Sequence, residues 1–228
     1  MSSDAKICVV IPAYREAGRL GAVVRAVCAQ GLVVVVVDDG SPDATAAEAA
    51  AAGAQVLRHA ANRGKGAALH TAYAWARTHG YDAVVTMDGD GQHDPTDIPA
   101  LLAAAHATGA AVVVGNRMAD TAAMPLVRRL TNRFMSWLLG LVMHQRVPDT
   151  QCGFRYYRLD VLPATPPPAA RFAAESEILL DLAECGARLA SAPVRTIYRD
   201  EKSKINPVVD TLRFFGMMLR RLMREKRG

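Results

Sequence analysis

The sequence predicts an α/β protein with an open, mostly parallel sheet that is covered by helices on both faces. Short runs of Val and Ile alternate with longer, Ala-rich segments of helical spacing along the first half of the chain. A continuous apolar run such as residues 32–37 is typical of a parallel strand that is buried on both faces. No Pro- or Gly-rich linker interrupts this alternation, so right-handed crossovers within one sheet are expected.

Each element of the first half has its own local signal. Pro12 ends the first strand because proline has no amide hydrogen to donate. Gly31 closes the first helix, in which apolar residues recur between residues 20 and 28. We expect strands at residues 6–11, 32–37, 54–57, 83–87 and 110–114, and further helices at about 42–52, 68–76 and 95–107.

The second half is predicted to be more helical. We expect helices at residues 126–143, 175–185 and 208–224, and strands at residues 154–157 and 190–198. The first and last of these helices are basic and amphipathic, which would suit a bilayer interface. For 126–143 we favour the simpler arrangement, in which the apolar side packs in the core. Residues 1–205 are thus expected to form one domain, followed by a basic amphipathic helix and tail at 206–228.

The net charge of +5 is unevenly divided. Residues 1–110 carry 8 Lys and Arg against 11 Asp and Glu (−3), and residues 111–228 carry 19 against 11 (+8). The second half is therefore expected to face an anionic partner such as a phosphate or a lipid surface. Scattered cysteines, no signal-peptide pattern and no apolar run of about 18 residues predict a cytoplasmic protein whose contact with a membrane is peripheral.

Polar residues follow four of the predicted strands. Glu16, Asp39, Asp88 and Arg117 each come shortly after a strand of the first half. Ligands of open parallel sheets bind beyond the carboxyl ends of the strands, where these side chains would meet. A packing role would need a separate explanation for each of them, so we expect one ligand crevice.

Asp88 and Asp90 follow a buried strand directly and are one residue apart. Two carboxylates about 4 Å apart repel each other by roughly 4 kcal/mol at an effective dielectric constant of about 20. A divalent cation would offset this repulsion, and Gln92 offers a further oxygen. We therefore predict a Mg²⁺ or Mn²⁺ site formed by Asp88, Asp90 and Gln92, with a substrate phosphate as an additional ligand.

These motifs together resemble the family 2 glycosyltransferases of the GT-A fold. Among them, the sequence is most similar to the dolichyl-phosphate or polyprenyl-phosphate mannose and glucose synthases. The matching segments follow the family's order along almost the whole chain: residues 11–16 (IPAYRE), 37–41 (VDDGS), 62–66 (NRGKG), 87–95 (MDGDGQHDP), 115–117 (GNR), 149–155 (DTQCGFR) and 203–206 (SKIN).

The resemblance implies an inverting, metal-dependent transfer of mannose or glucose from GDP-mannose or UDP-glucose to a polyprenyl or dolichyl phosphate. The residues that it implies for binding of the nucleotide sugar are Pro12, Tyr14, Glu16, Val37, Asp39, Lys65, Asp88, Gly89, Asp90, Arg199 and Lys204. Arg199 stands slightly closer to Lys204 than the family's spacing has it, which leaves Arg195 as an alternative.

The chemistry of the acceptor decides which other residues are needed. A lipid phosphate is already anionic and needs cationic orientation, which Arg117 and one of Arg128, Arg129 or Arg133 could give. Of the last three we predict Arg129 and Arg133, with Arg117, as the acceptor-binding residues. An alcohol would need a general base, for which Glu175 and Glu177 are the candidates; both could equally be favourable charges at a helix start. We predict Asp90, Arg117 and Glu177 as the catalytic residues.

Two other functions remain open at this point. A family member without a lipid substrate could use a glycan or a small alcohol as acceptor. A nucleic-acid-binding protein could use the basic second half, but the acidic crevice and the lack of interleaved aromatic and basic residues argue against it. Lys65 lacks the spacing of a Walker loop, and no glycine fingerprint of a dinucleotide site follows the first strand.

Overall fold

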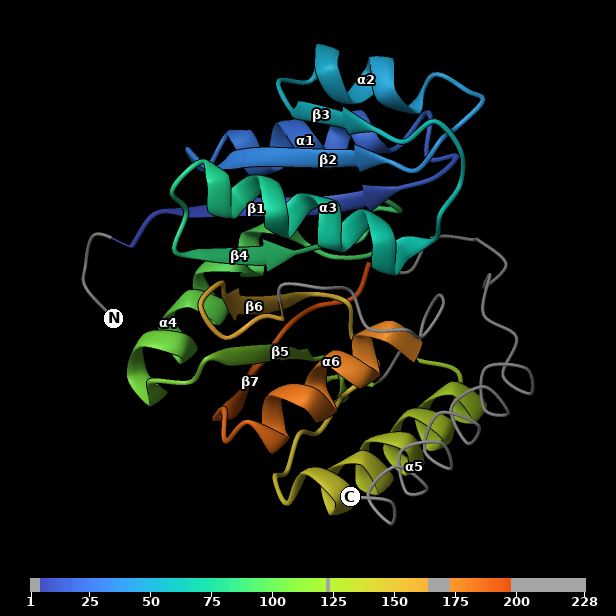
Figure 1. Cartoon of the computed structure of the whole chain (residues 1–228). Coiled ribbons are helices and arrows are strands. Elements are labelled where there is room, and N and C mark those ends of the chain that lie inside the picture. The colour runs from blue at the N-terminus through green and yellow to red at the C-terminus, as the bar shows by residue number, and fades with distance from the viewer. Residues whose placement is uncertain (1–4, 122–123, 164–172, 198–228) are drawn as a thin grey trace.

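A single seven-stranded sheet forms the centre of the molecule. The computed structural model describes residues 5–121, 124–163 and 173–197. The strands are β1 (Ile7–Ala13), β2 (Val33–Asp38), β3 (Gln55–Arg58), β4 (Ala83–Thr86), β5 (Val112–Asn116), β6 (Arg155–Arg158) and β7 (Leu189–Pro193). They lie in the order β3-β2-β1-β4-β6-β5-β7 (Figure 1).

The pairing confirms a mostly parallel sheet. Val9 of β1 lies between Val34 of β2 and Val85 of β4, and both pairings are parallel. The exception is β6, which runs antiparallel between β4 and β5 and places Tyr156 opposite Val85 and Val113. The last strand ends at Pro193, so the prediction of a strand over 190–198 was too long at its carboxyl end.

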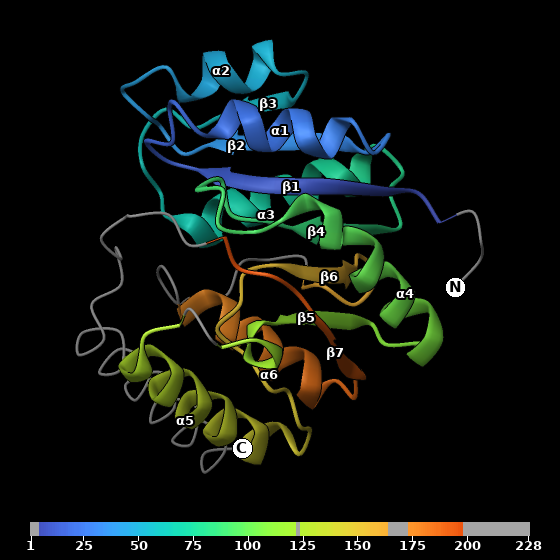
Figure 2. The ribbon, with the colours of Figure 1, turned by 180° about the vertical axis from the view of Figure 1, so that it is seen from behind.

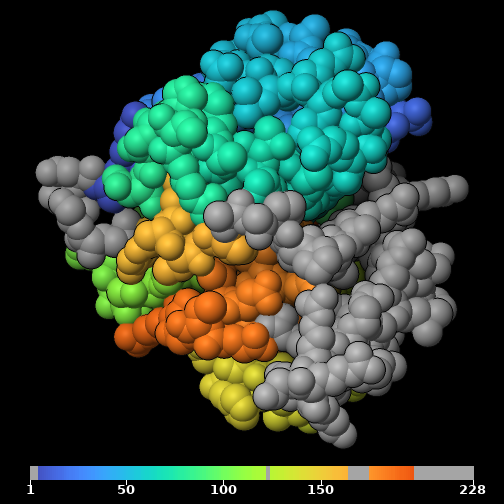
Figure 3. Space-filling view, in the orientation of Figure 1, coloured from blue at the N-terminus to red at the C-terminus, as the bar shows by residue number. Residues whose placement is uncertain are grey.

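Helices cover both faces of the sheet, as predicted. Figures 1 and 2 show α3 and α6 on one face and α1 and α4 on the other, and Figure 3 shows α3 and α6 on the first of these faces in space-filling form. The helices are α1 (Leu20–Cys28), α2 (Thr45–Ala51), α3 (Lys65–Thr78), α4 (Ile98–Thr108), α5 (Leu126–Met143) and α6 (Ala173–Glu184), with short 3₁₀ turns η1 (Pro95–Asp97) and η2 (Arg117–Ala119).

The helix α5 has the predicted bounds but not the predicted packing. It lies beside α6 and away from the sheet (Figures 1 and 2). Its buried residues are Asn132, Met135, Ser136, Leu139 and Met143. Six of its large apolar side chains are 47–66% exposed: Leu126, Val127, Leu130, Phe134, Trp137 and Leu141. The expectation that its apolar side packs in the core is therefore wrong.

No described helix is long and apolar enough to cross a membrane. The predicted helix 208–224, the tail to residue 228, Arg199 and Lys204 all lie outside the described residues.

Candidate active site

The carboxyl ends of β1, β2, β4 and β5 bring the predicted site residues to one edge of the sheet. Parallel strands end on the same side, so Glu16, Asp39, Asp88 and Arg117 follow strands that open on a common crevice. Asp88 stands two residues beyond β4, and the backbone turns at Gly89 and Asp90. The sheet topology thus brings these four positions to one edge of the sheet.

A half-buried lysine bridges one of these carboxylates and the start of α6. Lys65, the first residue of α3, places its Nζ 2.6 Å from Asp88 Oδ1 and 2.9 Å from Glu175 Oε2. Burial alone would favour neutral groups, but the opposite charges outweigh it. The two carboxylates raise the pKa of Lys65 above its ordinary value, and Lys65 and His93 hold the pKa of Asp88 well below its own. Lys65 and Asp88 are therefore both charged at neutral pH.

Gly153 packs directly against this cluster. A Cβ atom at this position would lie 2.8 Å from Asp88 Oδ2 and 3.1 Å from Lys65 Nζ, so only glycine leaves room for the pair. Thr86 Oγ1 at the end of β4 donates a hydrogen bond of 2.8 Å to the Gly153 carbonyl and fixes the backbone there. The residue is part of a motif that the resemblance picked out, but its role was not predicted.

Arg155 joins the loop before β6 to the start of α6. Its buried guanidinium donates to the carbonyls of Thr150, Cys152 and Glu175 and to the hydroxyl of Tyr157, at 2.6–2.9 Å. These bonds hold Glu175 against Lys65. Side chains two positions apart on a helix point in different directions, so Glu177 does not share the face of Glu175. The prediction of Glu177 as the catalytic carboxylate therefore chose the less favourably placed of the two.

The residues predicted to hold a metal fit a hard divalent cation. Asp88, Asp90 and Gln92 offer carboxylate and amide oxygens, the ligands that Mg²⁺ and Mn²⁺ prefer. Asp90 Oδ1 also accepts a hydrogen bond of 2.9 Å from the Gln92 amide, which fixes the turn between them. Among the described residues no three His, Cys, Asp or Glu side chains cluster as a metal site, so further ligands would come from substrate or water.

His93 supports the same turn. Its Nε2 lies 3.5 Å from Asp88 Oδ2, and its ring packs on Phe154 with a centroid distance of 5.2 Å. Residue 93 also forms an isolated antiparallel bridge with Thr196, and the Ile197 amide donates to the Gln92 carbonyl. The predicted metal loop is thus tied to the chain that follows β7.

Asp39 lies in a hydrogen-bond network at the end of β2. Its Oδ1 is 2.6 Å from His59 Nδ1 and accepts the Arg63 amide, and its Oδ2 accepts the Gly64 amide at 2.7 Å. Gly64 has φ +91°, which lets the chain turn into α3 and present Lys65. The network therefore couples a predicted donor-binding residue to the lysine at the centre of the site.

The other predicted donor-binding positions surround the crevice. Pro12 is half-buried, Tyr14 is exposed, Glu16 is buried, and the Val37 side chain is buried in the sheet, so only its backbone could face a ligand. A Cβ atom on Gly89 would lie 3.2–3.5 Å from Leu20, Ile11 and Glu16. Gly89 is therefore closely packed on the first strand and helix.

Arg117 is held away from the solvent. Its side chain is 6% exposed, and its Nε and Nη2 donate to the two carboxylate oxygens of Asp149 at 2.7 and 3.0 Å. Arg195, the alternative to Arg199, has its guanidinium and amide bonded to Thr96 and Asp97 beside η1. Both arginines thus have structural partners in this conformation.

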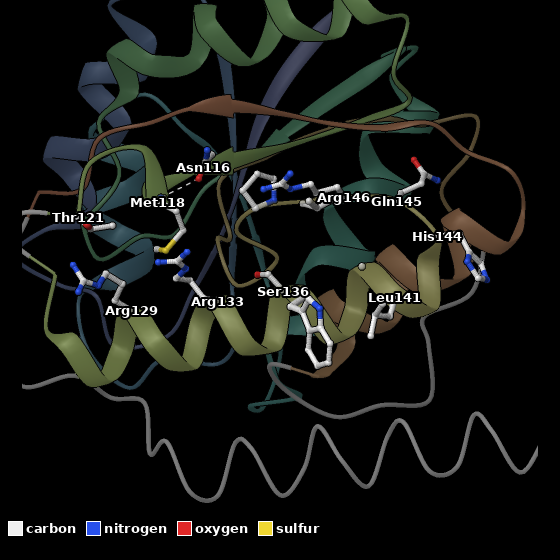
Figure 4. A pocket seen from close by; sticks show the side chains of 14 residues that line it. Asn116, Met118, Thr121, Arg129, Arg133, Ser136, Leu141, His144, Gln145 and Arg146 are labelled. Atoms are coloured by element: carbon white, nitrogen blue, oxygen red, sulfur yellow. Dashed lines mark hydrogen bonds between the residues drawn. The ribbon is translucent and has the colours of Figure 1, made fainter.

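A groove of about 710 Å³ runs between α5 and the end of β5. Arg129, Arg133 and Ser136 rise from α5 toward Asn116 and Met118 (Figure 4). Arg146 and His144 also line the groove, and none of the described Asp or Glu residues does. The predicted acceptor residues Arg129 and Arg133 are thus together in one basic groove, whereas Arg117 does not line it.

The loop before β6 connects the groove to the lysine cluster. Pro148 lines the groove and Gly153 touches Asp88, so the two ends of this five-residue step are at most about 18 Å apart. The amide of Thr150, midway along it, donates a hydrogen bond of 2.8 Å to Ser136 Oγ of α5, and the hydroxyl oxygens of the two residues are hydrogen-bonded at 3.0 Å. The loop that links the basic groove to the lysine cluster is therefore anchored on α5.

The sequence similarities agree with this arrangement. A model of glycosyl transferase family 2 matches residues 8–164. The chain belongs to glycosyltransferase family 2. The polyprenol monophosphomannose synthase of Mycolicibacterium smegmatis is 34% identical over 170 residues, which cover 68% of this chain and 62% of that protein. The undecaprenyl-phosphate mannosyltransferase of Micrococcus luteus is 30% identical over 178 residues, which cover 73% and 72%.

The fold of this glycosyltransferase is GT-A, as predicted. The glucosyl-3-phosphoglycerate synthase of Mycobacterium tuberculosis, crystallised with Mn²⁺, uridine diphosphate and glucosyl-3-phosphoglycerate, superposes with a TM-score of 0.69. It is 22% identical, and the match covers 87% of this chain and 74% of that one. At this identity the similarity concerns the fold.

Proposed function

We propose that this glycosyltransferase transfers mannose or glucose from a nucleoside-diphosphate sugar to a polyprenyl or dolichyl phosphate. The observation that carries this proposal is the basic groove, which is lined by arginines and, among the described residues, by no carboxylate. The loop at residues 148–153 links this groove to Asp88. Arg129 Nε is buried in this region and has no hydrogen-bond partner within the described chain. A buried guanidinium nitrogen without an acceptor is matched best by an anionic ligand.

The donor is proposed to lie over the ends of β1, β2 and β4. Pro12, Tyr14, Glu16, Val37 and Asp39 would surround the nucleoside, and Asp88, Gly89 and Asp90 would face the diphosphate. A bound Mg²⁺ or Mn²⁺, held by Asp88, Asp90 and Gln92, would offset the charge of the nucleoside-diphosphate leaving group. The ammonium of Lys65 stands beside Asp88 and would stabilise the same charge. Arg199 and Lys204 are proposed to complete this group of cations.

The acceptor phosphate is proposed to bind Arg129 and Arg133 in the groove. A phosphate monoester needs no base, because it is already anionic at neutral pH. It needs orientation toward the anomeric carbon, and in-line attack from the groove would invert that centre. Arg117 would act indirectly here, by holding Asp149 and thereby the loop that separates groove and crevice.

The relatives support a lipid phosphate as the acceptor class. Both curated relatives are named for sugar transfer to a polyprenol or its phosphate. Because such an acceptor resides in a membrane, we also propose that the enzyme contacts the membrane surface peripherally.

Glu175 is the basis of one alternative function, in which this enzyme transfers the sugar to a glycan or a small alcohol. Its carboxylate lies within 2.9 Å of Lys65 at the centre of the site, where a base for an alcohol could stand. Its Oε2 is already engaged by the Lys65 ammonium, which disfavours this role.

Two sets of variants separate these acceptors. If the acceptor is a phosphate, replacing either Arg129 or Arg133 by Ala should raise KM for polyprenyl phosphate roughly 10- to 100-fold, since each charged hydrogen bond contributes about 1.5–3 kcal/mol. Arg25→Ala on α1 is the matched control and should leave KM unchanged. Glu175→Gln with Glu177→Gln should retain most of the turnover, and a loss of several orders of magnitude would indicate an alcohol acceptor.

A further inference from the structure

The outer side of α5 carries an apolar stripe, which we name the α5 stripe: Leu126, Val127, Leu130, Phe134, Trp137 and Leu141. At about 100° per residue, five of these side chains fall within an arc of about 80°, and Val127 lies about 20° beyond it. Each is 47–66% exposed. A contiguous row of large exposed apolar side chains along a helix of 18 residues marks an interaction surface.

The border of the α5 stripe is strongly basic. On the same helical projection Arg133 and Arg129 lie about 20° and 60° from one edge of the stripe. The residues from 124 to 148 include four arginines and no Asp or Glu. The helix therefore has a buried side, a cationic flank and an exposed apolar side, in that order around its axis. This is the arrangement of a helix that lies in a lipid interface.

We propose that α5 lies parallel to an anionic membrane surface and inserts the α5 stripe among the lipid acyl chains. The helix is about 27 Å long, and an interfacial helix of this kind buries its apolar face by about 5–10 Å. The arginines then stand at the depth of the lipid headgroups, where anionic lipids attract each of them by about 1 kcal/mol.

This membrane orientation extends the proposed function. It depends on the proposed function only in taking the acceptor to be a lipid phosphate. Trp137 and Leu141 belong to the α5 stripe and also line the basic groove. With the stripe inserted, the groove opens at headgroup level, so a lipid phosphate reaches Arg129 and Arg133 while its chain remains in the bilayer. The acceptor then need not leave the membrane to be glycosylated.

A second copy of the chain is a less suitable occupant of this surface. An isologous dimer along the α5 stripe would place the basic flanks of two copies close to each other. No carboxylate among residues 124–148 could offset that repulsion. An anionic lipid surface supplies the opposite charge together with an apolar interior.

Trp137 serves as a probe of insertion in the full-length protein. Trp75→Phe leaves Trp137 as the one tryptophan of the chain. With vesicles of phosphatidylcholine and phosphatidylglycerol, its fluorescence should shift to the blue and be quenched by lipids brominated along the acyl chain. Phosphatidylcholine vesicles alone, or high salt, should weaken both effects. An unchanged spectrum when the protein floats with the vesicles would overturn the proposal.

Vesicle flotation with matched variants supplies the second test. Leu126→Ser, Leu130→Ser and Phe134→Ser together should reduce vesicle affinity by about tenfold or more. Val33 of β2 is an apolar residue with an exposed fraction of 45%, and Val33→Ser should not change the vesicle affinity. Equal flotation of both variants would place membrane contact elsewhere and refute the assignment. A lipid-free dimer that the triple substitution dissociates would refute it in favour of self-association.

Donor binding distinguishes this proposal from the proposed function. The triple variant should bind nucleotide sugar with the affinity of the unchanged enzyme in calorimetry, which also shows that it is folded. Asp90→Ala should lose metal-dependent donor binding but float normally. If the triple variant binds donor normally but floats with vesicles as well as the unchanged enzyme does, the α5 insertion is rejected. If Asp90→Ala keeps its metal-dependent donor binding while the triple variant loses flotation, the proposed function is rejected.

Discussion

Gly153→Ala tests the geometry of the lysine cluster most sharply. The new methyl group would stand 2.8 Å from Asp88 Oδ2, about 0.6 Å inside an ordinary contact of 3.4 Å, and 3.1 Å from Lys65 Nζ. Asp88 cannot remain in place, because the Gly153 backbone is fixed by Thr86. Overpacking of this kind costs about 1–3 kcal/mol of stability. Displacing a metal-binding carboxylate should weaken Mn²⁺ affinity roughly 10- to 100-fold.

Calorimetric titration of Mn²⁺ with and without a nucleoside diphosphate measures this loss, and urea unfolding measures the stability. Gly21→Ala is the control, because its Cβ would meet only the end of Arg25 at 3.4 Å and other atoms beyond that distance. In a helix this exchange should stabilise the protein slightly. If Gly153→Ala binds Mn²⁺ as tightly as Gly21→Ala does, Asp88 is not a metal ligand in this position.

The remaining predictions concern two side-chain networks of the site and two buried cysteine thiols. Lys65→Met leaves Asp88 and Glu175 without their cation, so the free energy of unfolding at pH 7 should fall by about 1–3 kcal/mol, whereas Lys65→Arg should lose less; equal losses would show that charge is irrelevant there. His59→Ala removes the partner of Asp39 and should raise the Kd for nucleotide sugar by up to about tenfold, with partial recovery in His59→Asn, and an unchanged Kd would uncouple this network from the donor. Burial raises the pKa of Cys8 to about 12 and of Cys152 to about 11, so their contribution to stability should be complete below pH 9 and be lost as pH rises toward 11–12. Cys8→Ala with Cys152→Ala should flatten that alkaline decline in urea unfolding, and a parallel curve would contradict the assignment.

Local patterns were sufficient to predict most of the fold. The Val-rich runs before Asp39 and Asp88 form buried parallel strands, because such runs suit a sheet covered on both faces. Strand order is not a local property, however, and nothing in the residues around Tyr156 indicated that β6 would insert antiparallel between β4 and β5. Contacts across the sheet decide this.

The helix α5 shows a different limit of the sequence. Its apolar periodicity gave the correct bounds, but periodicity alone does not say whether an apolar side faces a core or another phase. The side that packs on the protein is the one around Ser136 and Leu139. The surplus of apolar residues outside it reflects a function of the surface.

The sequence predicted which residues form the site better than it predicted which residues they contact. Asp88 and Lys65 were both named from motifs, but their ion pair and the third member, Glu175, depend on where α6 begins relative to β6. Arg117 was assigned to the acceptor from the family resemblance and its positive charge, whereas its pairing with Asp149 requires a loop 32 residues away. Gly153 could have been suspected only from a contact that no local pattern contains.

Transfer of sugar to matched acceptors tests the central claim most directly. The enzyme is incubated with Mg²⁺ or Mn²⁺ and radiolabelled GDP-mannose or UDP-glucose, together with polyprenyl phosphate or the same polyprenol without its phosphate. We predict that label enters the lipid fraction only with the phosphate, that chelation of the metal abolishes this transfer, and that substituting Arg129 and Arg133 reduces it. Equal transfer to the free polyprenol, or transfer to a water-soluble alcohol instead, would contradict the proposed function.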